Sequence, residues 1–270
     1  MRDIPLCAAE RLRDNDAHGY VVWTSPSGVT TTIVDSQGAL GAIAGLERGF
    51  DADAAGLALY ALILTLRARR GYPSDAMRSA VIQAAETLRS VIHPQYAPIL
   101  DQALTLTDSA LVNGDDAVEA LTAFTANTIA RLDRAAERCG RRAAALLDEN
   151  DRLLTTGAGA ALRWMLQIAI EQGTAPRIVD ADHRDEATIC VIAGVCVSTS
   201  GDVIGLLPDE IETIAAARRH GLPVYVLAPG GPVAGALPGD RLSAHLVSAI
   251  VTDRGIYRPE RIAAYQELSP

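Results

Sequence analysis

The spacing of apolar residues along the chain changes near residue 150, and the two parts predict different structures. Before that point, apolar residues recur three and four positions apart, which is the period of an amphipathic helix. The apolar stretch over residues 54–69 contains no turn-forming residue, so it predicts a long helix. We expect further helices over residues 74–90, from about Ile99 after the breaks at Pro94 and Pro98, and over 117–149 with Gly140 as a candidate interruption.

Extended structure in this first part is expected only near its beginning. Residues 20–23 (Tyr-Val-Val-Trp) and 30–34 (Thr-Thr-Thr-Ile-Val) are rich in β-branched and aromatic side chains, which favour strands. They flank the sequence Ser-Pro-Ser-Gly at residues 25–28, a combination typical of turns. The pattern predicts a β-hairpin.

After residue 150, short apolar runs alternate with helical segments. We expect strands over residues 152–155, 189–197 and 224–227, with helices over 158–171 and 208–220. A helix from Leu242 leads into a last strand that ends at Val251. Strands that alternate with helices form a mainly parallel sheet with helical crossovers.

The predicted fold class is therefore α/β with two parts. Residues 1–150 form a mainly helical N-terminal domain with a short β-hairpin. This domain is expected to pack on a Rossmann-like α/β domain with a mainly parallel sheet, formed by residues 151–270.

Composition narrows the range of functions. The 270 residues carry a net charge of −9, which disfavours a nucleic-acid-binding surface. All 24 basic residues are arginine, so the chain cannot form a lysine Schiff base, anchor pyridoxal phosphate or supply a phosphate-loop lysine. The first residues lack the pattern of a signal peptide, and the apolar runs are too short or too charged to cross a membrane. We expect a cytoplasmic protein that binds neither membranes nor nucleic acids.

The cysteines show no pattern of a metal or redox site. Cys7, Cys139, Cys190 and Cys196 have no CxxC spacing, and no His, Cys and Asp residues recur at metal-ligand spacing. Buried thiols are more common than disulfides in such a chain. We therefore expect no metal and no cofactor.

Four stretches of the second part carry more specific sequence. They are residues 153–159 (Leu-Leu-Thr-Thr-Gly-Ala-Gly), 200–203 (Ser-Gly-Asp-Val), 220–229 and 246–259. In this order they resemble the family of methylthioribose-1-phosphate isomerase, ribose-1,5-bisphosphate isomerase and the regulatory subunits of initiation factor 2B. Residues 35–39 (Asp-Ser-Gln-Gly-Ala) are similar to the glycine–alanine loop that precedes the family's first long helix.

The resemblance implies a homodimer and a phosphorylated sugar or nucleoside-derived ligand. The family's isomerases carry a cysteine and an aspartate for acid–base chemistry between C1 and C2 of an opened phosphosugar, and here those positions hold Thr156 and Val195. Neither can do that work. Cys196 is adjacent to Val195, but alternation along a strand would place it on the opposite face. The arginine that the family has before its glycine–alanine loop falls on Gln37.

The candidate site is a strand, a glycine-rich turn and a helix. Such a turn leaves backbone N–H groups free to hold a phosphate or carboxylate, although small residues there also let a strand and a helix pack closely. The candidate catalytic residues are Thr156 and Asp202, and Asp202 could equally be a turn residue or a helix cap. The candidate ligand-binding residues are Gly38, Ala39, Thr155, Gly157, Ala158, Gly159 and Gly201, with Asp35, Gln37 and Cys196 as further candidates.

Three functions remain open. The first is an enzyme of this fold with altered sugar-phosphate chemistry. The second is a ligand-binding or regulatory protein without catalysis, like the initiation-factor subunits. The third is a true aldose–ketose isomerase that uses Cys196 or Cys190 instead of the expected cysteine.

Overall fold

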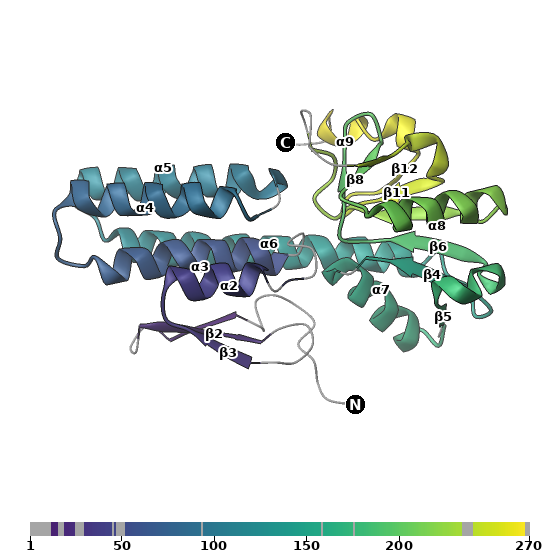
Figure 1. Ribbon diagram of the computed structural model, residues 1–270, viewed down its shortest axis with the longest axis horizontal. Helices are drawn as coiled ribbons and strands as arrows, with labels where there is room; N and C mark the ends of the chain where they lie inside the picture. The colour runs from purple at the N-terminus through teal and green to yellow at the C-terminus, as the bar shows by residue number, and fades with distance from the viewer. Residues whose placement is uncertain are drawn as a thin grey trace. The chain divides into compact units, whose positions relative to one another are not determined.

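The computed structural model confirms an α/β protein with a mostly parallel sheet (Figure 1). It describes residues 12–15, 19–24, 30–44, 46, 52–92, 94–157, 159–174, 176–233 and 240–267. Contacts between residues divide the chain into two compact units, Met1–Asp133 and Arg134–Pro270. Helix α6 (Ala117–Ala144) contributes residues to both units.

The first unit combines a small sheet with a group of helices around one buried helix. Its strands, in the antiparallel order β1-β2-β3, are β1 (Leu12–Asn15), β2 (Tyr20–Thr24) and β3 (Thr30–Ile33). Its helices are α2 (Ser36–Ala44), α3 (Ala52–Ala68), α4 (Ser74–Arg89), the short 3-10 helix η2 (Pro94–Tyr96), α5 (Ala97–Asn113) and the first part of α6. Helix α3 is apolar on all sides and contacts α2, α4 and α5, so it forms the core of the unit.

The hairpin of the first unit is confirmed, and several expected boundaries change. Strands β2 and β3 pair as expected, β1 adds a third strand, and the turn at residues 25–29 lies outside the described residues. Helix α5 begins at Ala97 instead of Ile99, because Pro98 fits the first turn of a helix, where its missing N–H is not needed. Helix α6 ends at Ala144, short of the expected residue 149.

Gly140 does not interrupt helix α6, contrary to expectation. The helix runs through it without a break. A Cβ at this position would lie only 2.8 Å from the carbonyl oxygen of Ala161, in helix α7 (Ala160–Glu171). Glycine therefore allows the two helices to approach closely.

The second unit is built on a six-stranded sheet of order β12-β11-β9-β6-β4-β5, parallel except for β12. The strands are β4 (Arg152–Thr156), β5 (Arg177–Val179), β6 (Ile189–Ile192), β9 (Val224–Leu227), β11 (Ala249–Val251) and β12 (Ile256–Tyr257). Numbered along the chain, the five parallel strands have the order 2-1-3-4-5, a doubly wound arrangement.

Helices cover both faces of this sheet (Figure 1). Leu153 of β4 packs in a core with Cys139 of α6 and Met165 of α7. Its neighbour Leu154 belongs to the core on the other face, together with Ile214 of helix α8 (Pro208–Arg219). Because successive side chains of a strand point to opposite faces, β4 contributes to both cores.

Two expected elements of the second unit are wrong. The strand expected over residues 189–197 is two strands, since the chain turns at Gly194 (φ +67°) and continues as β7 (Cys196–Val197) in a separate antiparallel sheet. That sheet has the order β10-β8-β7, with β8 (Val203–Ile204) and β10 (Arg241–Leu242). The helix expected from Leu242 is one 3-10 turn, η4 (Ala244–Leu246), because β10 and β11 leave no room for more.

The remaining short elements are the 3-10 helices η3 (Ala181–Glu186) and η5 (Pro259–Arg261) and the helical turn α9 (Ala264–Glu267). Within the described parts of the chain, no helix combines the length and the apolar character that crossing a bilayer requires.

Candidate functional site

In a sheet with this strand order, the position expected for a ligand lies between β4 and β6. In doubly wound sheets, ligands bind at the carboxyl ends of the strands where the strand order reverses. Here that point lies between the first and third parallel strands, which are β4 and β6. Thr156, the last residue of β4, pairs in register with Ile192, the last residue of β6. The turn after Thr156 is the one that the sequence analysis selected.

The turn itself depends on glycine. Gly157 has φ +79°, and Gly159 has φ +155° with ψ +164°, a region that other residues almost never occupy. A Cβ on Gly159 would lie 3.6 Å from the backbone nitrogen of Gly194, so the loops after β4 and β6 approach each other at the reversal point. Ala158 lies outside the described residues.

Helix α7 begins at this turn without a cap of its own. Gly159 is the residue before the helix, no side chain caps it, and the first turn holds no acidic residue. Ala160, Ala161 and Leu162 are buried, and within the described residues no hydrogen bond uses their N–H groups. Buried N–H groups at a helix N-terminus attract an anion, because the helix dipole adds positive potential there.

Helix α8, unlike α7, has an acidic side chain at its N-terminus that accepts a backbone hydrogen bond. The Glu210 carboxylate in its first turn accepts a hydrogen bond of 2.7 Å from the backbone N–H of Leu207, and Pro208 removes one donor. The chain therefore supplies its own acceptor for α8. At α7 no side chain of the described residues supplies such an acceptor.

Thr156 is a second group with unused hydrogen-bonding capacity at the carboxyl end of β4. Its side chain is 8% exposed, and its hydroxyl oxygen has no hydrogen-bond partner among the described residues. Buried hydroxyl groups in native proteins are nearly always paired with protein, water or a ligand. The hydroxyl of Thr156 and the first N–H groups of α7 thus both leave hydrogen-bonding capacity unused among the described residues at the carboxyl end of β4.

The carboxylate of Asp202 is used in hydrogen bonds inside the protein, one within its turn and one to η4. One carboxylate oxygen accepts hydrogen bonds from the backbone N–H of Ala244 (3.1 Å), and the other accepts from the Ser200 hydroxyl (2.9 Å). The adjacent Gly201 has φ +86° and leaves no space for a Cβ, which would lie 2.6 Å from the carbonyl oxygen of Pro259. These contacts favour the turn-stabilising interpretation of Asp202 and Gly201.

The candidates from residues 35–39 form the start of a helix and not a loop, which corrects the expectation. Helix α2 begins at Ser36, so Gln37, Gly38 and Ala39 are helical, and Ala39 is fully buried. Asp35 caps this helix, since its carboxylate accepts a 2.7 Å hydrogen bond from the N–H of Gly38. The Asp35 carboxylate therefore stabilises the N-terminus of α2.

The thiols are poorly suited to acid–base chemistry. Burial raises the pKa of Cys190 and of Cys196 to about 12. Burial also raises the pKa of Cys139, whose Sγ donates a hydrogen bond to the Val251 carbonyl oxygen. Val195, at the position of the family's aspartate, is buried and apolar. A thiolate is the reactive form of cysteine, so these three residues are unreactive near neutral pH.

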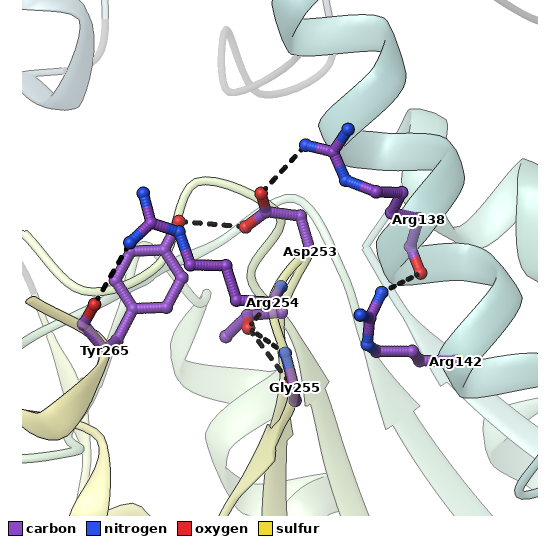
Figure 2. A network of polar contacts seen from close by, with 7 residues as sticks. Arg138, Arg142, Asp253, Arg254, Gly255 and Tyr265 are labelled. Atoms are coloured by element: carbon purple, nitrogen blue, oxygen red, sulfur yellow. Dashed lines mark hydrogen bonds and ion pairs between the residues drawn. The ribbon is translucent and has the colours of Figure 1, made fainter. Parts of the chain in front are cut away.

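A network around Asp253 was not anticipated (Figure 2). Asp253 follows β11 at the carboxyl edge of the sheet, where it accepts hydrogen bonds from Tyr265 (2.8 Å) and Arg138 (3.1 Å). One signal in the sequence was usable, a charged residue two positions after the end of a buried strand. Its partners are 12 and 115 residues away, so the network itself could not be foreseen. Within the described residues, no group of three His, Cys, Asp or Glu side chains could hold a metal ion.

Comparison with known proteins identifies the fold. No protein-family model matches the sequence, and no curated protein does. The 5-methylthioribose 1-phosphate isomerase from Pyrococcus horikoshii OT3 is 14% identical with a TM-score of 0.69, over 95% of this chain and 94% of that one. The delta subunit of translation initiation factor eIF-2B from A. fulgidus is 14% identical with a TM-score of 0.61, over 93% and 96%.

A chain of the tetrameric eIF2B-beta2-delta2 complex from C. thermophilum is 11% identical with a TM-score of 0.61, over 86% of this chain and 95% of that one. Nearly the whole of each protein is covered, so the likeness includes both units. The resemblance noted in the sequence is confirmed in the structure. The chain has the fold shared by methylthioribose 1-phosphate isomerase and the initiation factor 2B subunits.

Proposed function

We propose that this protein binds a small phosphorylated ligand, a phosphosugar or a nucleoside-derived phosphate, at the turn between β4 and α7. The observation that carries the proposal is the pair of unsatisfied donors at the carboxyl end of β4: the buried Thr156 hydroxyl and the buried N-terminus of α7, which no side chain caps. A phosphate oxygen accepts hydrogen bonds from both kinds of donor and is favoured by the helix dipole. One protein with this fold is named as the isomerase of a sugar phosphate, 5-methylthioribose 1-phosphate, and this supports the proposed ligand class.

Binding without the family's isomerisation chemistry fits this site best. Thr156 and Val195 replace the thiol and the carboxylate, Asp202 is used in its turn, and Cys190 and Cys196 are buried with a raised pKa. These observations favour a ligand-binding or regulatory role. Altered sugar-phosphate chemistry is the second candidate function, and Thr156 would be its one polar side chain at the turn.

Thr156→Val tests the proposal, because it should change stability and binding in opposite directions. Valine has nearly the shape of threonine, and removing a buried hydroxyl that lacks a partner should stabilise the free protein by about 1 kcal/mol. The same change should weaken binding about tenfold, since a hydrogen bond to a charged acceptor is lost. Thermal unfolding and titration calorimetry measure the two effects.

The ligands for this titration are chosen in pairs that differ only in the phosphate. AMP is compared with adenosine, and ribose 5-phosphate with ribose, beside methylthioribose 1-phosphate. Thr125→Val is the matched control, because Thr125 is a buried threonine of the first unit whose hydroxyl does have a partner, the carbonyl oxygen of Leu121. This variant should be less stable than wild type and should bind the ligands equally well. No difference within either pair, or a less stable Thr156→Val variant, would contradict the proposal. Turnover of methylthioribose 1-phosphate above about 1 s⁻¹ would show instead that the protein is an isomerase.

The proposal also includes a cytoplasmic homodimer. The sequence resemblance implies the dimer, and a chain of similar fold is part of a tetrameric complex, which supports association between chains of this fold. The net charge of −9 affects solubility more than it opposes a specific interface.

A further inference from the structure

The C-terminal strap, residues 258–265, is held down at Tyr265. The Tyr265 hydroxyl donates a 2.8 Å hydrogen bond to Asp253, and its backbone oxygen accepts one from Arg254. The Arg254 guanidinium lies 4.5 Å from the centre of the Tyr265 ring, a cation–π distance. Figure 2 shows the Arg254 side chain over the Tyr265 ring and Asp253 at the hydroxyl end of that ring. Arg138 of α6 donates to the other carboxylate oxygen of Asp253.

Two turns of the molecule have glycines where the strap needs space. At Gly231 (φ +72°), a Cβ would overlap the ring of Tyr265. At Gly201 (φ +86°), a Cβ would lie 2.6 Å from the carbonyl oxygen of Pro259. Pro259 and Tyr265 lie near the two ends of the strap, so each end fits closely against a different turn.

The same two turns hold β7, the strand that leads out of the proposed ligand site. The backbone N–H of Val233 donates to the carbonyl oxygen of Val197 in β7 (2.8 Å). The N–H of Ser198, just after β7, donates to the carbonyl oxygen of Asp202 (2.9 Å). Strand β7 begins two residues after Gly194, whose backbone faces Gly159 at the N-terminus of α7.

We infer that the strap is a latch for the site: the bond from Tyr265 to Asp253 anchors the strap, which holds the turn at Gly231 through Tyr265 and the turn at Gly201 through Pro259, and these turns fix β7 and the Gly194 loop. Tyr265 touches no ligand in this arrangement and is a positioning residue. The expected effect of the latch on ligand affinity rests on the proposed function, whereas its expected effect on the stability of β7 does not. Opening of the strap would expose the N–H groups of Ser198 and Val233 to solvent.

Tyr265→Phe tests the latch, because it removes the hydroxyl and keeps the ring. Tyr257→Phe is the matched control. The rings of Tyr257 and Tyr265 are arranged edge to face with their centroids 6.3 Å apart, and the Tyr257 hydroxyl makes no hydrogen bond within the described residues. Amide hydrogen exchange is followed at Ser198 and Val233, with the Cys190 amide in the central sheet as reference. Tyr265→Phe should speed exchange at Ser198 and Val233 about tenfold relative to Cys190, since a hydrogen bond to a carboxylate is lost.

AMP binding, measured by calorimetry on the same variants, tests the connection to the site. Tyr265→Phe should bind AMP several-fold more weakly than wild type, and Tyr257→Phe should bind it equally well. Equal acceleration at all three amides would indicate general destabilisation and would overturn the inference, as would unchanged exchange at Val233. If AMP binds wild type and Tyr265→Phe with equal affinity, the latch does not act on the site and the inference fails. If AMP does not bind wild type, the proposed function fails for this ligand, and exchange still decides whether the latch holds β7.

Discussion

At the scale of single residues, the buried thiols make stability depend on alkaline pH. Burial raises the pKa of Cys190 and Cys196 from an ordinary value of 9.0 to about 12. Below pH 9 both are protonated in the folded and the unfolded state, so their contribution to stability is complete. Above pH 9 the unfolded state loses these protons first, and stability is lost progressively toward pH 12.

We therefore expect the free energy of unfolding in urea to fall between pH 9 and pH 10. Tyr60 and Tyr265 have pKa values raised from 10.0 to about 12 and act in the same direction, but mainly above pH 10. The interval from 9 to 10 thus reports chiefly on the cysteines. The double variant Cys190→Ala and Cys196→Ala should show a flatter dependence there. An equally steep fall in the double variant would mean that other groups are responsible.

How far the site could be predicted depends on whether each residue acts through its neighbours in sequence. The turn from Thr156 to Gly159 at a strand end was predictable, because a strand, a glycine turn and a helix are adjacent in the chain. That these residues bind a ligand stays a prediction. The use of the Asp202 carboxylate in hydrogen bonds inside the protein could not be predicted, since one of its donors is Ala244, 42 residues away. The sequence is compatible with both interpretations of Asp202, a functional carboxylate and a turn residue.

At the scale of elements, long periodic segments were predictable and two- or three-residue strands were not. The long helices of the first unit, and β4 and β9, fall within a few residues of the expected positions. Strand β5 was missed because it is three residues long and only Val179 is buried. Strands β6 and β7 were read as one because both are apolar and fully buried, and only Gly194 separates their directions.

Gly140→Ala should destabilise the protein, although alanine is the better helix former. Alanine in a helix interior is favoured over glycine by up to about 1 kcal/mol. At position 140 the new methyl group would meet the backbone of α7 at Ala161, and such overpacking costs about 1–3 kcal/mol. The cost of overpacking exceeds the gain in helix propensity, so the substitution should lower the free energy of unfolding. Urea unfolding measures it.

Gly41→Ala is the control for this prediction. Gly41 lies in helix α2, is exposed, and has open space where a Cβ would be. The same substitution there should raise stability, because only helix propensity changes. If both variants gain stability, α6 and α7 can separate at Gly140 without loss, and the close approach is not required.

At the scale of the whole molecule, the structure gives the second unit a core that begins before residue 150. Ala136, Cys139, Ala143 and Leu147 pack in one apolar cluster with Leu153, Met165 and Val251 of the same unit. Arg138 adds its ion pair with Asp253. The sequence placed a boundary at residue 150 because the apolar period changes there. A period describes the secondary structure of a segment and does not say against which unit the segment packs.

Fragments of the chain should separate these two views of the boundary. We expect residues 134–270 to fold alone, because this fragment keeps the whole cluster and the Arg138–Asp253 pair. In the fragment of residues 151–270, Leu153, Met165 and Val251 would lose the residues of α6 that pack against them. The cavity or exposed apolar face left behind should lower the free energy of unfolding, by about 2–5 kcal/mol for each large side chain lost. Thermal unfolding followed by circular dichroism, with binding of a hydrophobic dye, compares the two. The longer fragment should unfold cooperatively at the higher temperature, and the shorter one should bind dye without heating. Equal unfolding temperatures would show that the end of α6 is not part of the core and that the second domain starts at residue 151.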